Sequence, residues 1–489
     1  MTVSDVAEVE GPPSTPQTAS PAGRYERVQT YLPDTDLAVA ARYMLQLMLR
    51  NVATDGFTFV DPASPPGTPR RSRPGCVLAS PSYPANLSRV DQDYVYHWTR
   101  DAAITAIELA HQPVALSPEG VSQTLCDYVT FTRACQQDAI AAGHPYRACF
   151  QIDATIRLWS DQADGPALEN LAFVAAWPRL DPATREVARE VAQQNLDRLV
   201  DDLFTHNGSG VDGMFNLWEE VTGPSFFARA VQLRCLEEAR STNTLQLALP
   251  AGLPNVVSEL RAALAGHWDA GAGLYRSVPG GSLPAGSLLT DLAGYDPNID
   301  VVSACVYGAV PCTDPKLLAT AARVRAAYET GGSCPYEINA TDAAMGHGPL
   351  IGRYPGDLYD GDVGKDRSLP TEGHPWALCT ANFAELYYRL AHRFDEGRGV
   401  AYDELTAAFF DQVRSEQIPV DAALVNDPAR SATVAEALRD AGDRMLKGLL
   451  YHSDHFELGE QFDSRTGYSK SVTNLTWSYA AYLSAVRAR

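Results

Sequence analysis

Apolar residues recur at intervals of three and four positions along most of the chain, which is the spacing of one helix face. Leu37, Ala41, Met44, Met48 and Val52 form the first such series. Alternating patterns of the kind that predict strands are few. The pattern therefore predicts an all-α fold of about a dozen helices. The other helical stretches lie at 102–111, 121–142, 166–176, 184–205, 225–240, 255–267, 315–328, 375–394, 401–417, 431–449 and 474–487.

Several of the expected helices carry start signals, and long loops separate many of them. Proline suits the first turn of a helix, and it stands there in Asp314-Pro315 and His374-Pro375. The connections at 61–96, 270–300 and 353–374 are longer than a simple helix bundle needs. No repeat of about 34 or 40 residues is evident, which disfavours a solenoid. We expect a helical globule whose long loops carry the chemistry.

The first residues differ from the rest in composition. The stretch 1–23 is rich in Pro, Ser, Thr and Ala and lacks the basic and apolar regions of a secretory signal. We expect residues 1–30 to be a disordered tail and residues 31–489 to form one domain. The expected location is cytoplasmic, or secreted if a leader has been removed.

The charge balance excludes two classes of partner. Acidic residues outnumber basic ones by 60 to 39, and the formal net charge is −21. Such a surface repels nucleic-acid phosphates and anionic lipid, and no apolar run is long enough to span a bilayer. The nine cysteines are scattered without a CxxC pair, which argues against a zinc site. We expect a soluble monomer without nucleic-acid or membrane partners.

The segment 94–101, with the sequence YVYHWTRD, combines aromatic rings with an adjacent charged pair. One interpretation is that Asp101 caps a helix that starts at Ala102. The other is that Trp98, Arg100 and Asp101 hold the end of a sugar. Flat rings stack on the apolar face of a pyranose, and charged groups bond strongly to vicinal hydroxyls.

The segment 216–227 places two adjacent glutamates, Glu219 and Glu220, between Trp218 and an apolar helix. Adjacent glutamates usually lie on a solvated surface, and this is an unusual place for two charges. Burial would raise the pKa of one of them. A general acid needs a raised pKa in order to arrive protonated.

Two further segments add a cation and two more carboxylates. In the turn-rich stretch 350–357, Arg353 and Asp357 could simply form a structural ion pair, and Glu460 alone would be an ordinary loop acid. Together, the four segments supply two separated glutamates and an Arg/Asp/Trp clamp. Glycoside cleavage needs one carboxylic acid to protonate the leaving oxygen and a second carboxylate to activate water.

These segments, in this order, resemble the glucoamylases of glycoside hydrolase family 15, in particular the fungal-type branch. The resemblance runs from about Thr35 to the C-terminus. It rests on five blocks, each only moderately specific by itself. The blocks are 77–82 with 94–101, Trp159 with 164–168, 217–221, 352–357 with 375–376, and 459–463 with 475–479.

The resemblance implies an (α/α)6 barrel whose long loops form an active-site funnel, and release of β-glucose by inversion without metal or organic cofactor. It implies Glu219 as general acid and Glu460 as general base. It also implies an α-glucan or oligosaccharide substrate. Because the chain ends soon after the block 475–479, we expect no starch-binding domain after the barrel. The substrate-binding residues that the resemblance implies are Tyr94, Trp98, Arg100, Asp101, Trp159, Trp218, Glu220, Arg353, Asp357, Trp376, Gln461 and Trp477.

The chain departs from the family pattern mainly in the region beyond the cleaved bond. The stretch 159–164 is one residue shorter than usual, Ala163 stands where arginine is common, and Asn216 replaces a frequent aspartate. The segment 359–373 is an insertion near the expected mouth of the site. These departures bear on chain length and linkage preference. Cys305 and Cys312 resemble a disulfide-bonded pair of the family, although a reducing compartment would keep them as thiols.

The leading hypothesis is exo-acting hydrolysis of α-1,4-linked maltooligosaccharides, with slower cleavage of α-1,6 bonds. Within the same chemistry, isomaltose-type α-1,6 bonds or trehalose could be preferred. An inverting phosphorylase could share the barrel and the acid, but it needs an anion pocket and no equivalent of Glu460. A glucan-binding protein without catalysis is the remaining alternative, and the presence of both glutamates argues against it.

Overall fold

The computed structural model describes residues 36–65, 67–83, 93–112, 118–205, 214–280, 282–362, 372–415 and 418–489. The stretch 1–30, expected to be a disordered tail, lies outside these residues. The main helices are α1 (Leu37–Leu49), α2 (Thr99–His111), α3 (Pro118–Ala141), α4 (Gly165–Ala176), α5 (Pro182–Thr205), α6 (Phe226–Ser241), α7 (Leu253–Ala265), α8 (Asp300–Tyr307), α9 (Pro315–Tyr328), α11 (Ala377–Asp395), α14 (Ser431–His452) and α15 (Thr476–Ala488).

The remaining elements are short. They are the helices α10 (Glu337–Ala344), α12 (Ala407–Val413) and α13 (Ala422–Val425), and the single 3-10 turns η3 (Trp177–Arg179) and η4 (Pro428–Arg430). Three antiparallel two-stranded hairpins pair β1 (His97–Trp98) with β2 (Cys149–Phe150), β3 (Trp268–Asp269) with β4 (Leu274–Tyr275), and β5 (Gln461–Phe462) with β6 (Ser469–Lys470).

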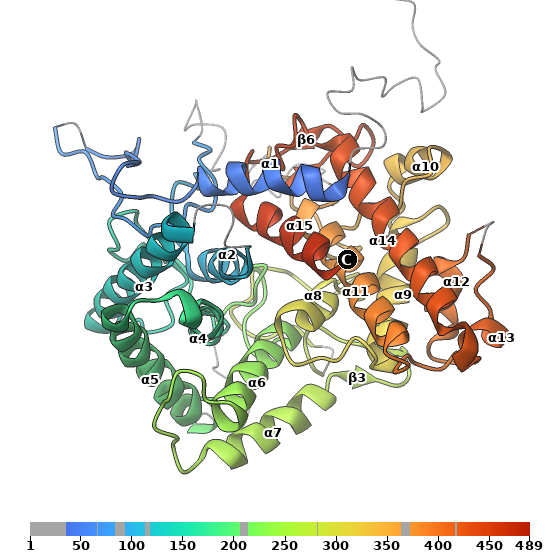
Figure 1. Cartoon of the computed structure of the whole chain (residues 1–489), viewed down its shortest axis with the longest axis horizontal. Coiled ribbons are helices and arrows are strands. Elements are labelled where there is room, and N and C mark those ends of the chain that lie inside the picture. The colour runs from blue at the N-terminus through green and yellow to red at the C-terminus, as the bar shows by residue number, and fades with distance from the viewer. Residues whose placement is uncertain are drawn as a thin grey trace, which may run out of the picture.

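The main helices form two concentric rings (Figure 1). The inner ring closes on itself, because α2 packs on α4, α4 on α6, α6 on α8, α8 on α11, α11 on α15, and α15 on α2. The helices α1, α3, α5, α7, α9 and α14 alternate with these along the chain and pack against them from outside. The fold is therefore an (α/α)6 barrel, as expected from the sequence.

The two rings bury their helices differently. The outer helix α1 buries one stripe, formed by Leu37, Ala40, Met44, Leu45 and Met48, and this stripe explains its clear sequence pattern. In the inner helix α8 all eight residues are buried. A helix without a polar face has no periodicity to detect, so the sequence analysis missed α8. It also missed α10, and the helix expected at 401–417 is confined to Ala407–Val413.

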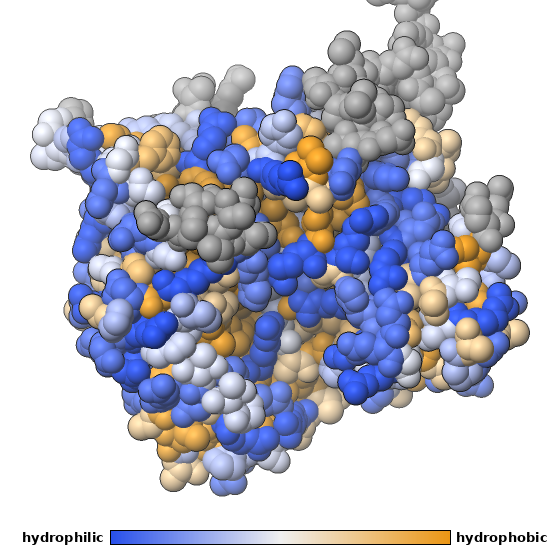
Figure 2. Space-filling view, viewed as in Figure 1, coloured by the Kyte–Doolittle hydropathy of each residue, from blue (hydrophilic) through white to orange (hydrophobic). Residues whose placement is uncertain are grey.

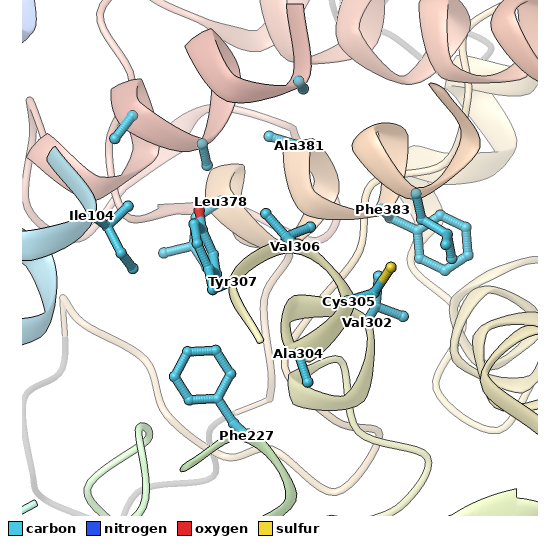
Figure 3. Close-up of a cluster of buried hydrophobic side chains, with 14 of the residues drawn as sticks. Ile104, Phe227, Val302, Ala304, Cys305, Val306, Tyr307, Leu378, Ala381 and Phe383 are labelled. Carbon is cyan, nitrogen blue, oxygen red and sulfur yellow. The ribbon is translucent and has the colours of Figure 1, made fainter. Parts of the chain in front are cut away.

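The centre of the barrel is solid. Phe227 of α6, Tyr307 of α8 and Leu378 of α11 point toward one another there (Figure 3). All three side chains are buried. Because packed side chains fill the barrel, ligands can reach only its two ends.

One end of the barrel is closed by charged side chains. The helix α8 ends at Tyr307, and its last carbonyl groups need partners. Arg234 Nη1 donates to the Tyr307 carbonyl at 2.9 Å, and Arg389 Nη2 donates to the Val306 carbonyl at 3.0 Å. Arg389 also pairs with the buried Glu385 at 2.6 Å. These arginines satisfy the end of a short buried helix.

Hydrophilic residues cover much of the visible face of the molecule. The face turned to the viewer in Figure 2 is mostly hydrophilic, with apolar residues scattered over it. Within the described ranges, no helix is both long and apolar enough to cross a bilayer.

All nine cysteines are free thiols, Cys305 and Cys312 included, so the disulfide that the family resemblance implies is not formed in this structure.

Candidate active site

A cavity of about 530 Å³ lies at the end of the barrel where the inner helices begin. Trp98 directly precedes α2, Trp376 directly precedes α11, and Leu475 directly precedes α15. Loops from distant parts of the chain complete the walls. The lining residues are Ala79, Asp93, Tyr94, Trp98, Arg100, Asp101, Arg157, Trp159, Ser160, Phe215, Leu217, Trp218, Glu219, Glu220, Leu288, Arg353, Tyr359, Trp376, Glu460, Leu475 and Trp477.

A tight turn before α6 positions Glu219. Its φ angle is 61°, in the left-handed region. Adopting this conformation costs a residue with a side chain about 1–2 kcal/mol. Asn216 holds this turn: its Oδ1 accepts from the backbone N–H groups of Glu220 and Val221, both at 3.2 Å. The Glu219 N–H donates to the Asn216 carbonyl at 3.0 Å. The turn aims the Glu219 side chain into the cavity.

Three N–H donors surround the Glu219 carboxyl group. Trp98 Nε1 donates to Oε1 at 3.0 Å, and Gln162 Nε2 donates to the same oxygen at 2.8 Å. Trp159 Nε1 donates to Oε2 at 2.8 Å. Two rings and an amide from two separate segments therefore fix the orientation of this carboxyl group.

Three hydroxyl groups surround the carboxyl group of Glu460, which precedes strand β5. Tyr94 donates to Oε1 at 2.8 Å, Tyr359 donates to Oε2 at 3.0 Å, and Ser471 also donates to Oε2. Burial raises the pKa of Glu460, while the hydrogen bonds from Ser471, Tyr94 and Tyr359 and the positive charge of Arg353 lower it. Burial prevails, so the pKa of Glu460 lies above its ordinary value.

Arg100 and Asp101 line the cavity from the first turn of α2. Arg100 Nη1 pairs with the buried Asp164 at 2.9 Å, and Nη2 donates to the Leu217 carbonyl at 3.0 Å. Burial raises the pKa of Asp101 to about 7, against the opposing effect of the Arg100 charge. The helix begins at Thr99 with Trp98 as its cap, so the interpretation of Asp101 as an N-cap is wrong. Asp101 lies inside the first turn.

Arg353 also lines the cavity. It forms the ion pair with Asp357 considered in the sequence analysis, through Nε at 2.8 Å and Nη2 at 2.6 Å. It also pairs with Glu220 Oε1 at 3.2 Å, while Tyr354 donates to Glu220 Oε2 at 2.5 Å. The guanidinium therefore reaches the cavity with its orientation fixed by two buried carboxylates.

Aromatic rings form much of the cavity wall. Trp98 lies between Tyr94 and Trp159, with ring-centroid distances of 5.5 and 6.2 Å. Trp376 lies 5.9 Å from Trp218. Trp477 Nε1 donates to the Tyr307 hydroxyl at 3.4 Å, which connects the cavity to the packed centre of the barrel.

The predicted residues meet as one group. Both expected catalytic glutamates line the cavity, together with ten of the twelve expected substrate-binding residues. Asp357 and Gln461 lie behind this wall, where Asp357 holds Arg353 and Gln461 holds the backbone of Tyr359. The sequence analysis did not assign roles to several contributing residues, which are Asp93, Arg157, Gln162, Phe215, Leu288, Tyr359 and Ser471.

Weak signals could have found two of these residues. Tyr359 stands two positions after Asp357, in the part of the chain that the analysis treated as an insertion. Arg157 stands two positions before Trp159, and its guanidinium lies 4.3 Å from the Trp159 ring and 3.7 Å from the Tyr96 ring. Gln162 and Ser471 are common polar residues in loops, and only the fold brings them to the glutamates.

Comparison with known proteins agrees with this geometry. The model of the family "Glycosyl hydrolases family 15" matches residues 45–487. A probable glucoamylase of Schizosaccharomyces pombe is 25% identical over 436 residues, with 85% of each chain covered. Glucoamylase 1 of Rhizopus oryzae is 28% identical over 458 residues, which cover 90% of this chain and 68% of that one.

The fold has a solved counterpart. The glucoamylase from Saccharomycopsis fibuligera superposes with a TM-score of 0.72 at 23% identity, covering 96% of this chain and 98% of that one. The barrel, the cavity with its two glutamates and the family match together define a glycoside hydrolase. The chain belongs to family 15 of the glycosyl hydrolases, which confirms the resemblance found in the sequence.

Proposed function

We propose that this enzyme removes single glucose units from the non-reducing ends of α-1,4-linked glucans and maltooligosaccharides, and more slowly cleaves α-1,6 bonds. Inversion at the anomeric carbon would release β-D-glucose. The observation that carries the proposal is that Glu219 and Glu460 line one cavity, and each carboxyl group is oriented by three hydrogen-bond donors. The names of the relatives, all glucoamylases, support the substrate class.

The donors distinguish the two oxygens of each carboxyl group. A carboxylate oxygen offers two lone pairs. Among the described residues, Glu219 Oε1 accepts two bonds and Oε2 accepts one, so Oε2 has room for the acid proton. In Glu460 the order is reversed, since Oε2 accepts two bonds and Oε1 accepts one. Oε1 is then the oxygen that takes a proton from water.

The reaction follows from these two positions. Glu219 gives its proton to the glycosidic oxygen as the bond from that oxygen to the anomeric carbon breaks. Glu460 takes a proton from a water molecule, whose oxygen forms the new bond to the same carbon on the opposite face. The leaving chain departs with a hydroxyl group. Glu219 ends ionised and Glu460 ends protonated, so exchange of one proton with solvent restores the enzyme.

The blind end of the cavity supports exo action. Arg100, Asp101 and Arg353 lie at the buried part of the wall, whereas Leu288 at its rim is 58% exposed. Trp477 closes the floor against Tyr307 of the packed barrel centre. A chain end can enter such a pocket but a continuous chain cannot pass through it. We propose that Arg100, Asp101 and Arg353 bind the hydroxyls of the terminal glucose, and that the aromatic walls pack on its ring.

The product first released from maltoheptaose tests the proposal. Proton NMR during the first turnovers is expected to show β-glucose and maltohexaose. Release of α-glucose would contradict inversion, and release of maltose or longer fragments would contradict exo action. A ranking of kcat/KM on maltose, isomaltose, maltoheptaose and trehalose decides the linkage, with maltoheptaose expected first. Phosphate-dependent formation of glucose 1-phosphate would instead identify a phosphorylase.

A further inference from the structure

The hairpin of β5 and β6 positions both the donor and the acceptor of one hydrogen bond. Glu460 directly precedes β5 and Ser471 directly follows β6. The pairing of Gln461 with Lys470 brings them to the same end of the hairpin, where Ser471 donates to Glu460 Oε2. The position of Glu460 therefore depends on the backbone of Ser471.

The backbone of Ser471 is strained. Its φ angle is 65°, in the left-handed region, which costs a residue with a side chain about 1–2 kcal/mol. Such a conformation persists only where the surroundings hold it. Here the Ser471 N–H donates to Asp362 Oδ1 at 2.9 Å. Asp362 belongs to the segment that the sequence analysis identified as an insertion.

Lys470 binds the same insertion by charge. Its Nζ lies 3.0 Å from Asp360 Oδ1 and 3.1 Å from Asp362 Oδ2. The Lys470 side chain is 16% exposed and that of Asp360 is 10% exposed, so solvent screens this pair only partly. Asp362 is held at both oxygens, because Lys470 pairs with Oδ2 and the Ser471 N–H donates to Oδ1.

Asp360 anchors this cluster to the barrel. His374 Nδ1 accepts from the Ser464 N–H at 3.2 Å, so its Nε2 carries the hydrogen and donates to Asp360 Oδ2 at 3.2 Å. Burial works to raise the pKa of Asp360, but hydrogen bonds from Lys470, the Asp362 N–H and His374 outweigh it and lower the pKa. The Asp360 carboxylate is therefore a stable anion within the cluster.

The same short segment also positions the other hydroxyl on Glu460 Oε2. The Gly361 N–H donates to Gln461 Oε1 at 3.0 Å, and Gln461 Nε2 donates to the Tyr359 carbonyl at 3.0 Å. Tyr359 then donates its hydroxyl to Glu460 Oε2 at 3.0 Å. Both donors to Oε2 are thus held by residues 359–362.

We propose that Asp360, Asp362 and Lys470 form a positioning clamp for Glu460. By holding the Ser471 hydroxyl on Oε2, beside that of Tyr359, the clamp turns Oε1 toward the cavity, where it meets the reacting water. The inference rests on the proposed function of Glu460 as base. None of the three clamp residues lines the cavity, so their effect on the reaction passes through Ser471 and Glu460.

The clamp predicts a change in the pH profile. The groups that face the Glu460 carboxyl are the hydroxyls of Tyr94, Tyr359 and Ser471, and the charge of Arg353. Losing the Ser471 donor raises the pKa of Glu460 further, because a hydrogen bond to the ionised form is lost. Since the base must be ionised, activity would then disappear at a higher pH on the acidic side.

Three variants test the clamp. Asp362→Ala removes both the charge and the acceptor for the Ser471 N–H, whereas Asp362→Asn keeps an acceptor oxygen. The matched control is Arg465→Gln, at a residue of the same hairpin. This change breaks an exposed ion pair of 3.1 Å between Arg465 and Glu372. Kcat and KM on maltotriose are measured from about pH 3 to pH 8.

For Asp362→Ala we expect a fall in kcat of about fivefold or more, an acidic limb shifted upward by about half a pH unit or more, and a KM within about twofold of the parent value. Asp362→Asn is expected to recover most of the loss, and Arg465→Gln to behave as the parent. An unshifted acidic limb in Asp362→Ala, or an equal effect of Arg465→Gln, overturns the proposal.

Amide hydrogen exchange gives a second readout that needs no turnover. The Ser471 amide is expected to exchange faster in Asp362→Ala than in the parent or in Arg465→Gln. Unchanged exchange overturns the clamp even if activity falls. Failure of the proposed function has a different signature, namely a parent enzyme that releases no glucose from any glucan while the exchange of Ser471 still responds to Asp362→Ala.

Discussion

Tyr94 and Trp98 lie with their ring centroids 5.5 Å apart, and each donates a hydrogen bond to a different glutamate of the cavity. The Tyr94 hydroxyl bonds Glu460 Oε1 at 2.8 Å, and Trp98 Nε1 bonds Glu219 Oε1 at 3.0 Å. One segment of five residues therefore contacts both carboxyl groups. The two glutamates come from loops far apart in sequence, and this segment helps to set their separation.

Replacing Tyr94 by phenylalanine removes one of the three donors to Glu460. The pKa of Glu460 is already raised by burial, and loss of a bond to its ionised form raises it further. We expect the acidic limb of kcat/KM to move to higher pH and kcat at the optimum to fall about tenfold. Tyr96→Phe is the control, since Tyr96 bonds Asp93 and not Glu460. If the acidic limb of kcat/KM lies at the same pH in Tyr94→Phe and Tyr96→Phe, the role of Tyr94 is contradicted.

Replacing Glu219 by glutamine removes the proposed proton donor but keeps the shape of the side chain. We expect kcat on maltose to fall about 10²–10⁴-fold, with a smaller change in KM. Hydrolysis of α-glucosyl fluoride should fall much less, because fluoride leaves without needing a proton. Glu460→Gln should impair both substrates. A Glu219→Gln variant with normal activity on maltose would remove the basis of the mechanism.

The buried Glu169 of α4 makes stability depend on pH. Burial raises its pKa to about 7 from 4.5, although Asn195 donates to its Oε2 at 2.9 Å. The folded state therefore binds this proton more tightly than the unfolded chain does. The resulting stabilisation of the fold is fully present below pH 4.5 and is lost as the pH rises toward 7. The difference amounts to about 3 kcal/mol in the free energy of unfolding.

In Glu169→Gln the side chain stays neutral at every pH. We therefore expect its Tm to decline less between about pH 4.5 and pH 7 than that of the parent, and to exceed the parent value above pH 7. Calorimetric scans across this range measure the effect. Glu186→Gln, at a side chain that is 71% exposed, should leave the parent slope unchanged. Parallel Tm curves for Glu169→Gln and parent would show that Glu169 does not titrate in this range.

Replacing Arg389 by glutamine tests the closed end of the barrel. The change deprives the buried Glu385 of its ion pair and removes one hydrogen-bond donor from the Cys305 and Val306 carbonyls. We expect the free energy of unfolding to fall by about 2–4 kcal/mol, with kcat/KM nearly unchanged at low temperature. Arg393→Gln, which breaks an exposed pair with Glu396, is the control and should change Tm little. A lowered kcat/KM in Arg389→Gln would show coupling between the two ends.

The sequence by itself determined the helical class, most outer helices and the residue types of the site. Outer helices such as α1 bury one stripe, and the stripe is visible as spacing. The segments around Trp98 and Glu219 place rings and charges side by side along the chain, so local sequence suffices to single them out. The family resemblance then ordered these segments and connected Glu460 with them.

Only the tertiary structure decided which groups touch the two carboxyls. Gln162, Tyr359 and Ser471 are ordinary residues in sequence, and each reaches a glutamate because a loop folds over the barrel mouth. The buried helix α8 likewise has no polar face that could mark it in the sequence. Periodicity reports how a segment divides itself between core and solvent, whereas hydrogen bonds between distant loops depend on geometry that no local pattern contains. The expected chemistry was therefore readable from the chain, and the oxygen proposed for each step could be chosen only from the fold.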